Sequence, residues 1–163
     1  MNFFTGDQDD TSCNDYHVLN DPTRNMDYGN DDGGFCDSQP PLWDRNLSPQ
    51  WKGPAWYRFT EPAGTRMPEE PVEGGWRCNT QVSGWLNGSH PTTPGETIDG
   101  TVCFSASNGN NCYRTSQIKV KHCGSYYLYY LVNASGCNRR YCATRNSASG
   151  NYLPFIFSAY AHR

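Results

Sequence analysis

Eight cysteines are the residues of this chain with the most definite chemistry. Their number is even and no C-x-x-C pair occurs, which favours four disulfides over a zinc site. The alternative is eight free thiols in a reducing compartment, where such a density of thiols is rare. We therefore predict a disulfide-stapled chain from an oxidising compartment. The cysteines are Cys13, Cys36, Cys78, Cys103, Cys112, Cys123, Cys137 and Cys142.

Three asparagines stand in the Asn-x-Ser pattern that accepts N-linked glycans: Asn46, Asn87 and Asn133. One such triplet can arise by chance in a chain rich in Asn and Ser. Three triplets together with a disulfide framework favour real use, although Pro49 directly after the first triplet weakens Asn46 as an acceptor. The sequence thus predicts a glycoprotein.

Aromatic and basic residues supply the groups that bind sugars, namely a flat ring face and donors for hydroxyl groups. Trp43 and Trp51 lie in a Pro-rich connector at residues 38–55 and are candidates for an exposed platform. Arg139 and Arg140 could attract an acidic sugar, although a solvated face is the default for such a cluster. The remaining tryptophans are predicted to fill the core: Trp56, Trp76 and Trp85.

Carboxylates cluster among glycines in one loop, where Asp27, Asp31 and Asp32 are weak candidates for calcium ligands. The spacing does not fit the EF-hand pattern and lacks its final glutamate. A solvated loop is therefore favoured over a calcium site, and no other cofactor or metal is indicated.

Catalytic motifs are absent from the sequence. It has no nucleophile-elbow pattern, no H-E-x-x-H and no phosphate loop. His90 precedes Pro91 in a turn, where a structural hydrogen bond is expected. We therefore predict that the protein is not an enzyme.

The charge pattern and the hydropathy of the sequence argue against two kinds of partner, nucleic acid and the membrane interior. A net charge of −3 with scattered basic residues argues against nucleic acid, and no apolar run approaches the roughly 20 residues of a spanning helix. Met1 is followed almost at once by acidic residues, so we take it as a trimmed start from which any export signal has been removed. The expected location is extracellular, with a carbohydrate or a glycoprotein as partner.

The elements that must position these residues are short strands. Only 36% of the residues are hydrophobic, so aromatic side chains and disulfides have to supplement a thin aliphatic core. Residues 116–122 alternate between apolar and polar side chains, and residues 125–132 are dense in aromatic and branched ones. The two runs predict an antiparallel hairpin with Cys123 at its bend. Residues 56–59 and 97–104 are further candidate strands.

The predicted fold class is mainly β: a small disulfide-rich domain of short antiparallel strands and long ordered loops. We divide the chain into a flexible acidic N-terminus (1–12), an eight-cysteine domain (13–142) and a C-terminal extension (143–163). That extension ends in an apolar, strand-like run at 152–160. This run has to be covered, either on its own domain or by a second copy in a homodimer.

Taken in order, these pieces resemble the eight-cysteine extracellular domain of the uromodulin family, over about residues 13–142. The resemblance uses all eight cysteines. It also rests on short motifs between them: Leu19-Asn20-Asp21-Pro22-Thr23-Arg24, Cys36-Asp37, Trp56-Tyr57-Arg58-Phe59, Gly64-Thr65-Arg66-Met67-Pro68, Trp76-Arg77-Cys78, Gly84-Trp85-Leu86-Asn87-Gly88-Ser89-His90-Pro91, Val120-Lys121-His122-Cys123 and Tyr141-Cys142.

The resemblance implies the disulfide pairing Cys13–Cys123, Cys36–Cys137, Cys78–Cys142 and Cys103–Cys112, which sequence alone would not select from 105 connectivities. Vertebrate members carry an additional cysteine pair, and Val72 and Asn111 stand at those places here. Asn79 stands where the family usually has glycine, so a local turn is expected to differ.

For function, we expect secreted, glycan-dependent recognition with lectin-like carbohydrate binding. The reason is that no epidermal-growth-factor or zona-pellucida module flanks the domain, and a dimer through the C-terminal strand would supply two sugar sites. The resemblance implies the main alternative, a decoy that presents its own N-glycan, near Asn133, to microbial lectins. A matrix or biomineral-associated protein is the remaining hypothesis.

Overall fold

The computed structural model describes residues 13–29, 34–39 and 46–145. Several sequence predictions fall outside these residues, namely the N-terminus 1–12, Asp31, Asp32, Trp43 and the apolar run at 152–160. The three-part division of the chain and the homodimer therefore stay predictions.

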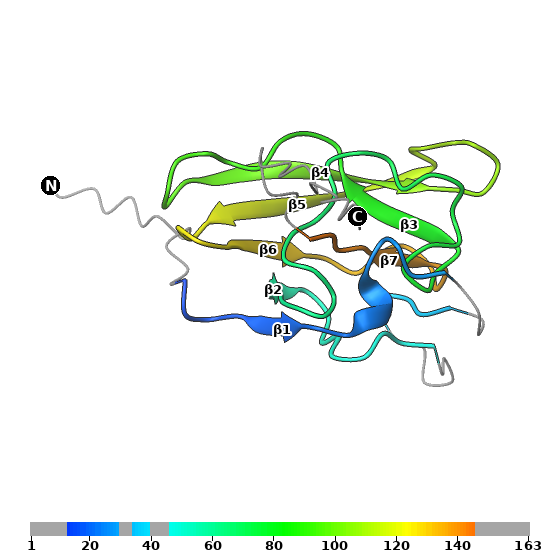
Figure 1. The fold of residues 1–163 in the computed structure, drawn as a ribbon, viewed down its shortest axis with the longest axis horizontal. Helices are drawn as coiled ribbons and strands as arrows, with labels where there is room; N and C mark the ends of the chain where they lie inside the picture. Colours follow the sequence, from blue (N-terminus) through cyan, green and yellow to red (C-terminus); the bar gives the residue numbers. More distant parts are fainter. Residues whose placement is uncertain (1–12, 30–33, 40–45, 146–163) are drawn as a thin grey trace, which may run out of the picture.

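Within the described residues, seven strands form one curled, mixed sheet, in the order β1-β2-β6-β5-β4-β3-β7 (Figure 1). This confirms the mainly β fold class. The strands are β1 (His17–Leu19), β2 (Ala55–Phe59), β3 (Val82–Leu86), β4 (Thr97–Ser105), β5 (Arg114–His122), β6 (Tyr127–Leu131) and β7 (Arg139–Tyr141). No α-helix occurs in this part of the chain, and the one helical turn is the 3₁₀ turn η1 (Pro22–Arg24).

The predicted hairpin is the centre of the sheet. β5 pairs antiparallel with β6 on one side and with β4 on the other. At the bend, the Cys123 amide donates to the Tyr126 carbonyl at 2.8 Å. Gly124 takes a left-handed φ of +81°, which glycine adopts without strain. Ile118 and Val120 are buried, as their alternation predicts.

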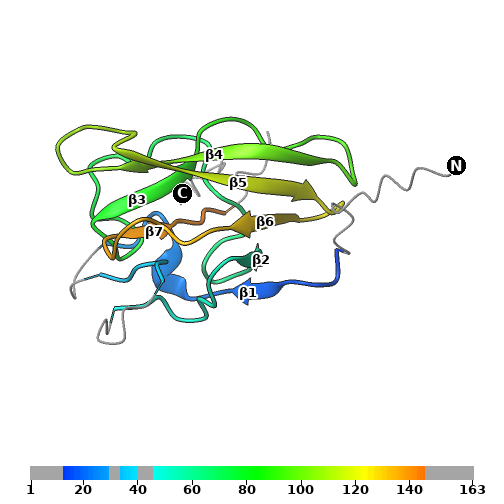
Figure 2. The same ribbon diagram turned by 180° about the vertical axis from the view of Figure 1, so that it is seen from behind.

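The two edge strands of the sheet, β1 and β7, each pair parallel with their neighbour, and the segments that follow them meet. β1 pairs parallel with β2, and β7 pairs parallel with β3. Beyond β7, the Ala143 amide donates to the Arg24 carbonyl at 2.9 Å, and the Met26 amide donates to the Ala143 carbonyl at 2.8 Å. The chain after η1 therefore lies beside the chain after β7 (Figures 1 and 2).

Aromatic rings fill the space inside the curl, which is the compensation that the low aliphatic content demands. Gly84 in β3 leaves room for the backbone of β7 and the Phe104 ring of β4, because a Cβ there would lie 2.9 Å from both the Arg140 carbonyl and that ring. The large apolar side chains of the core include Leu19, Tyr57, Phe59, Met67, Leu86, Phe104, Tyr129, Leu131 and Tyr141.

Candidate functional site

All eight cysteines are paired, and the pairs are the four that the resemblance implies. Cys13–Cys123 fastens the segment before β1 to the hairpin bend, across 110 residues of sequence. Two further bridges, Cys36–Cys137 and Cys78–Cys142, fasten the segments on either side of β7. Cys103–Cys112 closes the turn between β4 and β5, across 9 residues. The disulfides thus tie the sheet edges to its centre.

A buried ion pair lies where the sheet edges meet. The Arg24 guanidinium donates to both Asp37 carboxylate oxygens, at 2.6 and 3.0 Å, and neither side chain is exposed. Asp37 also accepts from the Tyr141 amide at 2.9 Å, and Arg24 donates to the Tyr141 carbonyl at 2.9 Å. Burial alone would raise the pKa of Asp37, but the Arg24 guanidinium holds that pKa below its ordinary value.

Arg140 occupies the same region and is equally structural. It donates to the Cys78 carbonyl and the Thr23 hydroxyl, each at 2.9 Å, and to Asp21 at 3.2 Å. Asp21 in turn accepts from the Thr23 amide at 2.8 Å and so caps η1. The Asp21–Arg24 motif of the resemblance therefore positions two buried cations.

These contacts correct the sequence-based placement of the arginines. Arg140 is fully buried and Arg139 is 7% exposed, so neither lies on a solvated face that could attract an acidic sugar. The cause is β7 itself, which is enclosed between β3 and the chain around Asp37, whose amide donates to the Arg139 carbonyl at 2.9 Å. Burial lowers the pKa of both guanidinium groups.

The tryptophans also differ from prediction. Trp51, expected on an exposed platform, is 5% exposed and stacks on Tyr57 with ring centroids 5.0 Å apart. Trp76, expected in the core, is 44% exposed. Trp85 is buried as predicted and donates its indole N–H to the Asn111 carbonyl at 2.8 Å. Trp56 is half-buried on the outer face of β2, since its neighbour Tyr57 points into the core.

The departures from the vertebrate pattern have structural counterparts. Val72 is buried against Trp85 and Cys103, and Asn111 accepts from the same tryptophan, so both substituted positions contact Trp85. Asn79 adopts a left-handed φ of +50°. Asparagine tolerates that region better than most residues, which explains how it stands in a place usual for glycine.

The three glycan acceptors differ in accessibility. Asn87 and Ser89 are both exposed, at the turn that follows β3. Asn133 is half-buried with its carbonyl oxygen Oδ1 fully buried, and the hydroxyl of its Ser135 accepts from Arg139 at 3.1 Å. Asn46 is exposed, but Ser48 is 3% exposed. Asn87 is therefore the most open acceptor in the described structure.

His90 makes the structural hydrogen bonds that its turn motif predicts. Its Nδ1 contacts the Glu69 carboxylate, and its Nε2 lies 2.7 Å from the Tyr129 hydroxyl. The Tyr129 hydroxyl accepts from the Met67 amide at 3.0 Å, so its own proton is available for Nε2. The Tyr129 contact fits a neutral imidazole whose Nε2 accepts, while Nδ1 faces both the Glu69 carboxylate and the Arg66 guanidinium, whose Nη2 lies 2.7 Å away. Burial lowers the pKa of His90 to about 4; the Glu69 hydrogen bond opposes that shift and the Arg66 charge adds to it.

The buried His90 predicts a pH-dependent stability. From pH 6.5 down to about 4, the unfolded chain takes up a proton at this position that the folded chain does not. This proton uptake favours the unfolded state, so the free energy of unfolding is highest above pH 6.5 and decreases as the pH falls. We expect the free energy of unfolding to drop by about 2 kcal/mol between pH 7 and pH 5. Urea titrations at several pH values should show a weaker pH dependence of the free energy of unfolding for His90→Gln than for the original protein. His122→Gln serves as the control. An unchanged slope in His90→Gln would contradict the assignment.

The calcium hypothesis gains no support. Asp27 is exposed and its amide donates to the Asn25 side chain at 2.9 Å, while Asp31 and Asp32 lie outside the described residues. Within residues 13–29, 34–39 and 46–145, no three His, Cys, Asp or Glu side chains gather in a way that could hold a metal ion.

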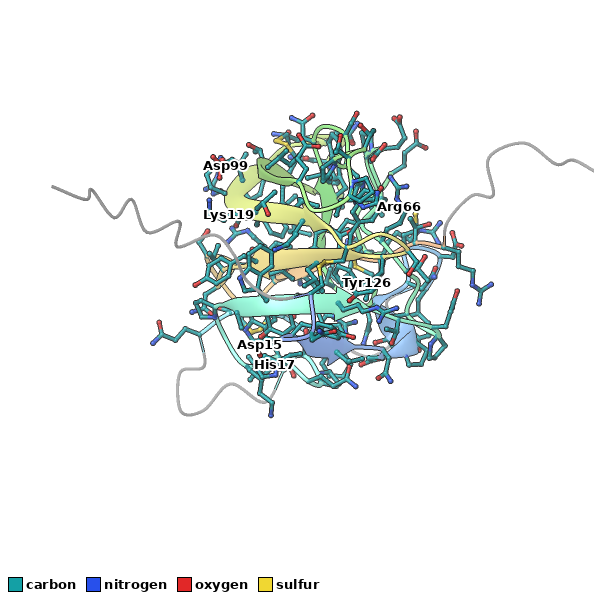
Figure 3. All side chains as sticks on the ribbon, turned by 90° about the vertical axis from the view of Figure 1, so that its left-hand side faces the viewer. Asp15, His17, Arg66, Asp99, Lys119 and Tyr126 are labelled. Atoms are coloured by element: carbon teal, nitrogen blue, oxygen red, sulfur yellow. A yellow bond between two sulfur atoms is a disulfide. The ribbon has the colours of Figure 1, made fainter. Side chains whose placement is uncertain are left out.

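Sequence reasoning missed a hollow on the outer face of the sheet. It is lined by residues of β1, β2, β6 and the segment before β1: Asp15, Tyr16, His17, Ala55, Trp56 and Tyr130. Figure 3 labels two of them, Asp15 and His17, beside β1. The sequence contained part of the evidence for this hollow. Trp56 and Tyr130 lie in predicted strands next to Tyr57 and Tyr129, and neighbouring residues of a strand point to opposite faces. Their pairing across two strands about 70 residues apart was not visible in the sequence.

The fold and the four bridges define a disulfide-stapled, mainly β domain of the kind that forms in oxidising compartments. No helix of the described part is long and apolar enough to cross a membrane. The chain belongs to the family of uromodulin-like eight-cysteine domains, whose sequence profile matches residues 57–143. This family is extracellular and non-enzymatic.

Relatives extend the similarity beyond the profile match. The chain is 34% identical over 143 residues to the pancreatic secretory granule membrane major glycoprotein GP2 of Mus musculus, which covers 85% of this chain and 24% of that protein. It is 37% identical over 139 residues to the uromodulin of Rattus norvegicus, covering 85% of this chain and 19% of that protein. The chain thus spans about a quarter or less of the length of these relatives.

Proposed function

We propose that this domain is an extracellular recognition module that presents its own N-linked glycans. The observation that supports it best is the turn at Asn87, where the acceptor asparagine and the serine of its triplet are both exposed. A relative named as a glycoprotein adds support. The disulfide-tied sheet gives such a glycan a rigid base, which limits the ordering cost when a partner binds the sugar.

Asn133 is the second presenting position in this proposal. It follows β6 and precedes Cys137, so the chain on both sides of it is anchored. Two glycans on one rigid domain would allow a multivalent partner to bind both, with a gain in avidity.

Lectin-like binding is the second candidate function. Three of its sequence-predicted residues are buried, namely Trp51, Arg139 and Arg140. The specific observation in favour of a lectin is instead the outer-face hollow at Trp56 and Tyr130.

The test is binding of a mannose-specific lectin to the full chain secreted from a eukaryotic host. We expect binding that is lost after enzymatic removal of N-glycans, together with glycopeptides at Asn87 and Asn133 by mass spectrometry. Asn87→Gln should remove one glycan and weaken capture, while Asn14→Gln, which lies in no acceptor triplet, serves as the matched control. Unmodified Asn87 and Asn133 in the secreted protein would overturn the proposal.

A further inference from the structure

We propose that the outer-face hollow is a binding site for a neutral pyranose sugar. Asp15, Tyr16, His17, Ala55, Trp56 and Tyr130 line it. Figure 3 shows Asp15 and His17 together beside β1. The inference does not depend on the glycan-presenting function, because the site would bind a sugar of another molecule.

Strand register builds the aromatic part of the site. Trp56 in β2 and Tyr130 in β6 are direct cross-strand partners, and their neighbours Tyr57 and Tyr129 are fully buried on the opposite face. The two rings meet edge to face, with centroids 5.6 Å apart and an interplanar angle of 66°. Two half-buried rings at this angle form a corner in which the C–H face of a sugar can pack on one ring.

Tyr16, a further aromatic residue that lines the hollow, is held in place by the Arg58 guanidinium. Arg58 donates to the Tyr16 hydroxyl at 3.0 Å, and its guanidinium lies 3.8 Å from the centroid of the Tyr126 ring. Tyr126 donates to the Cys13 carbonyl at 2.5 Å, next to the Cys13–Cys123 bridge. Tyr16 is therefore preorganised, so little side-chain entropy is lost when a ligand binds.

Polar groups around the corner have unused hydrogen-bonding capacity. Among the described residues, the Asp15 carboxylate, the Trp56 indole N–H and the Tyr130 hydroxyl have no hydrogen-bond partner, while the His17 ring lies against Tyr57 on the inner face. All three residues line the hollow, and Asp15 is exposed. Together they offer a charged acceptor and two donors, a set that can bind vicinal sugar hydroxyls.

The charges at the site favour a neutral ligand. Asp15 would repel the carboxylate of an acidic sugar. Arg58, which borders the hollow, would disfavour an organic cation in the aromatic corner. A purely apolar ligand would leave the polar groups of the hollow without partners and would cover an exposed carboxylate.

The experiment is calorimetry on the full chain after enzymatic removal of its N-glycans, so that its own sugars cannot contribute. The probes are the methyl glycosides of mannose, glucose and galactose, with choline as the cationic control. We expect at least one glycoside to bind. Trp56→Ala should weaken that binding by about tenfold or more, and Trp76→Ala, at an exposed tryptophan outside the hollow, should leave it unchanged.

Asp15→Asn guards against a folding artefact, because Asp15 is exposed and has no partner within the described structure to lose. We expect it to weaken sugar binding with an unchanged midpoint of urea unfolding. The proposal is overturned if no glycoside binds at millimolar concentration, if choline alone binds, or if Trp56→Ala and Asp15→Asn both bind as the original protein does. None of these outcomes bears on whether Asn87 carries a glycan.

Discussion

Replacing Asp37 by asparagine is expected to lower the free energy of unfolding by about 3–5 kcal/mol, because the change removes one half of a buried ion pair. The Arg24 guanidinium would remain fully buried with its charge uncompensated. Arg140 lies in the same interior and adds to the positive charge there. The asparagine side chain keeps the shape of the aspartate, so the loss reports charge and hydrogen bonding, not a cavity.

Urea unfolding with the disulfides intact would measure this effect. The matched control is Asp99→Asn, which removes a carboxylate that is 85% exposed and accepts from Lys119 at 3.1 Å. Solvent screens that pair, so the unfolding midpoint should hardly move. A double replacement of Arg24 and Asp37 by apolar residues should be less damaging than Asp37→Asn alone. Equal stability of Asp37→Asn and Asp99→Asn would show that the buried pair does not stabilise the fold.

The second large effect is expected from the Cys13–Cys123 bridge. In the loop-entropy description, a bridge across 110 residues contributes about 5 kcal/mol, and one across 9 residues contributes about 2.5 kcal/mol. Replacing both members of Cys13–Cys123 by serine should therefore destabilise the protein by about 2 kcal/mol more than the same change at Cys103–Cys112. The long bridge also anchors the Tyr126 contact at Cys13.

Both double-serine variants can be compared by their urea midpoints under non-reducing conditions, with the slope of the transition as a check on the unfolded state. The two variants serve as controls for each other, because each loses one bridge and gains two hydroxyls. A larger loss at Cys103–Cys112 would mean that native contacts at the β4–β5 turn outweigh the constraint on the unfolded chain.

Local pattern was sufficient to predict the centre of the sheet. The alternation at Ile118 and Val120 and the aromatic density of β6 predicted the hairpin, because side-chain period and burial are coupled in a strand. The runs that became β2 and β4 were predicted for the same reason. The disulfide pairs followed from the resemblance, since cysteine spacing alone leaves the connectivity open.

Long-range contacts decided the rest, and these have no local signature. β7 contains Arg139 and Arg140, a pair that indicates a solvated surface until the buried partners of Arg140 are known. Trp51 sits in a connector, and only the curl of the sheet places Tyr57 beneath its ring. The outer-face hollow depends on the register of β2 against β6, which no spacing within either strand reveals.

The spacing of the four bridges has a consequence for how the chain matures during synthesis. Three cysteines, Cys13, Cys36 and Cys78, emerge long before their native partners, which all lie at or beyond Cys123. In an oxidising lumen, the early thiols can pair with one another, and such bonds have to be exchanged later. We therefore expect a thiol–disulfide isomerase to speed productive oxidation of this domain, and secretion yield to fall in a host poor in that activity.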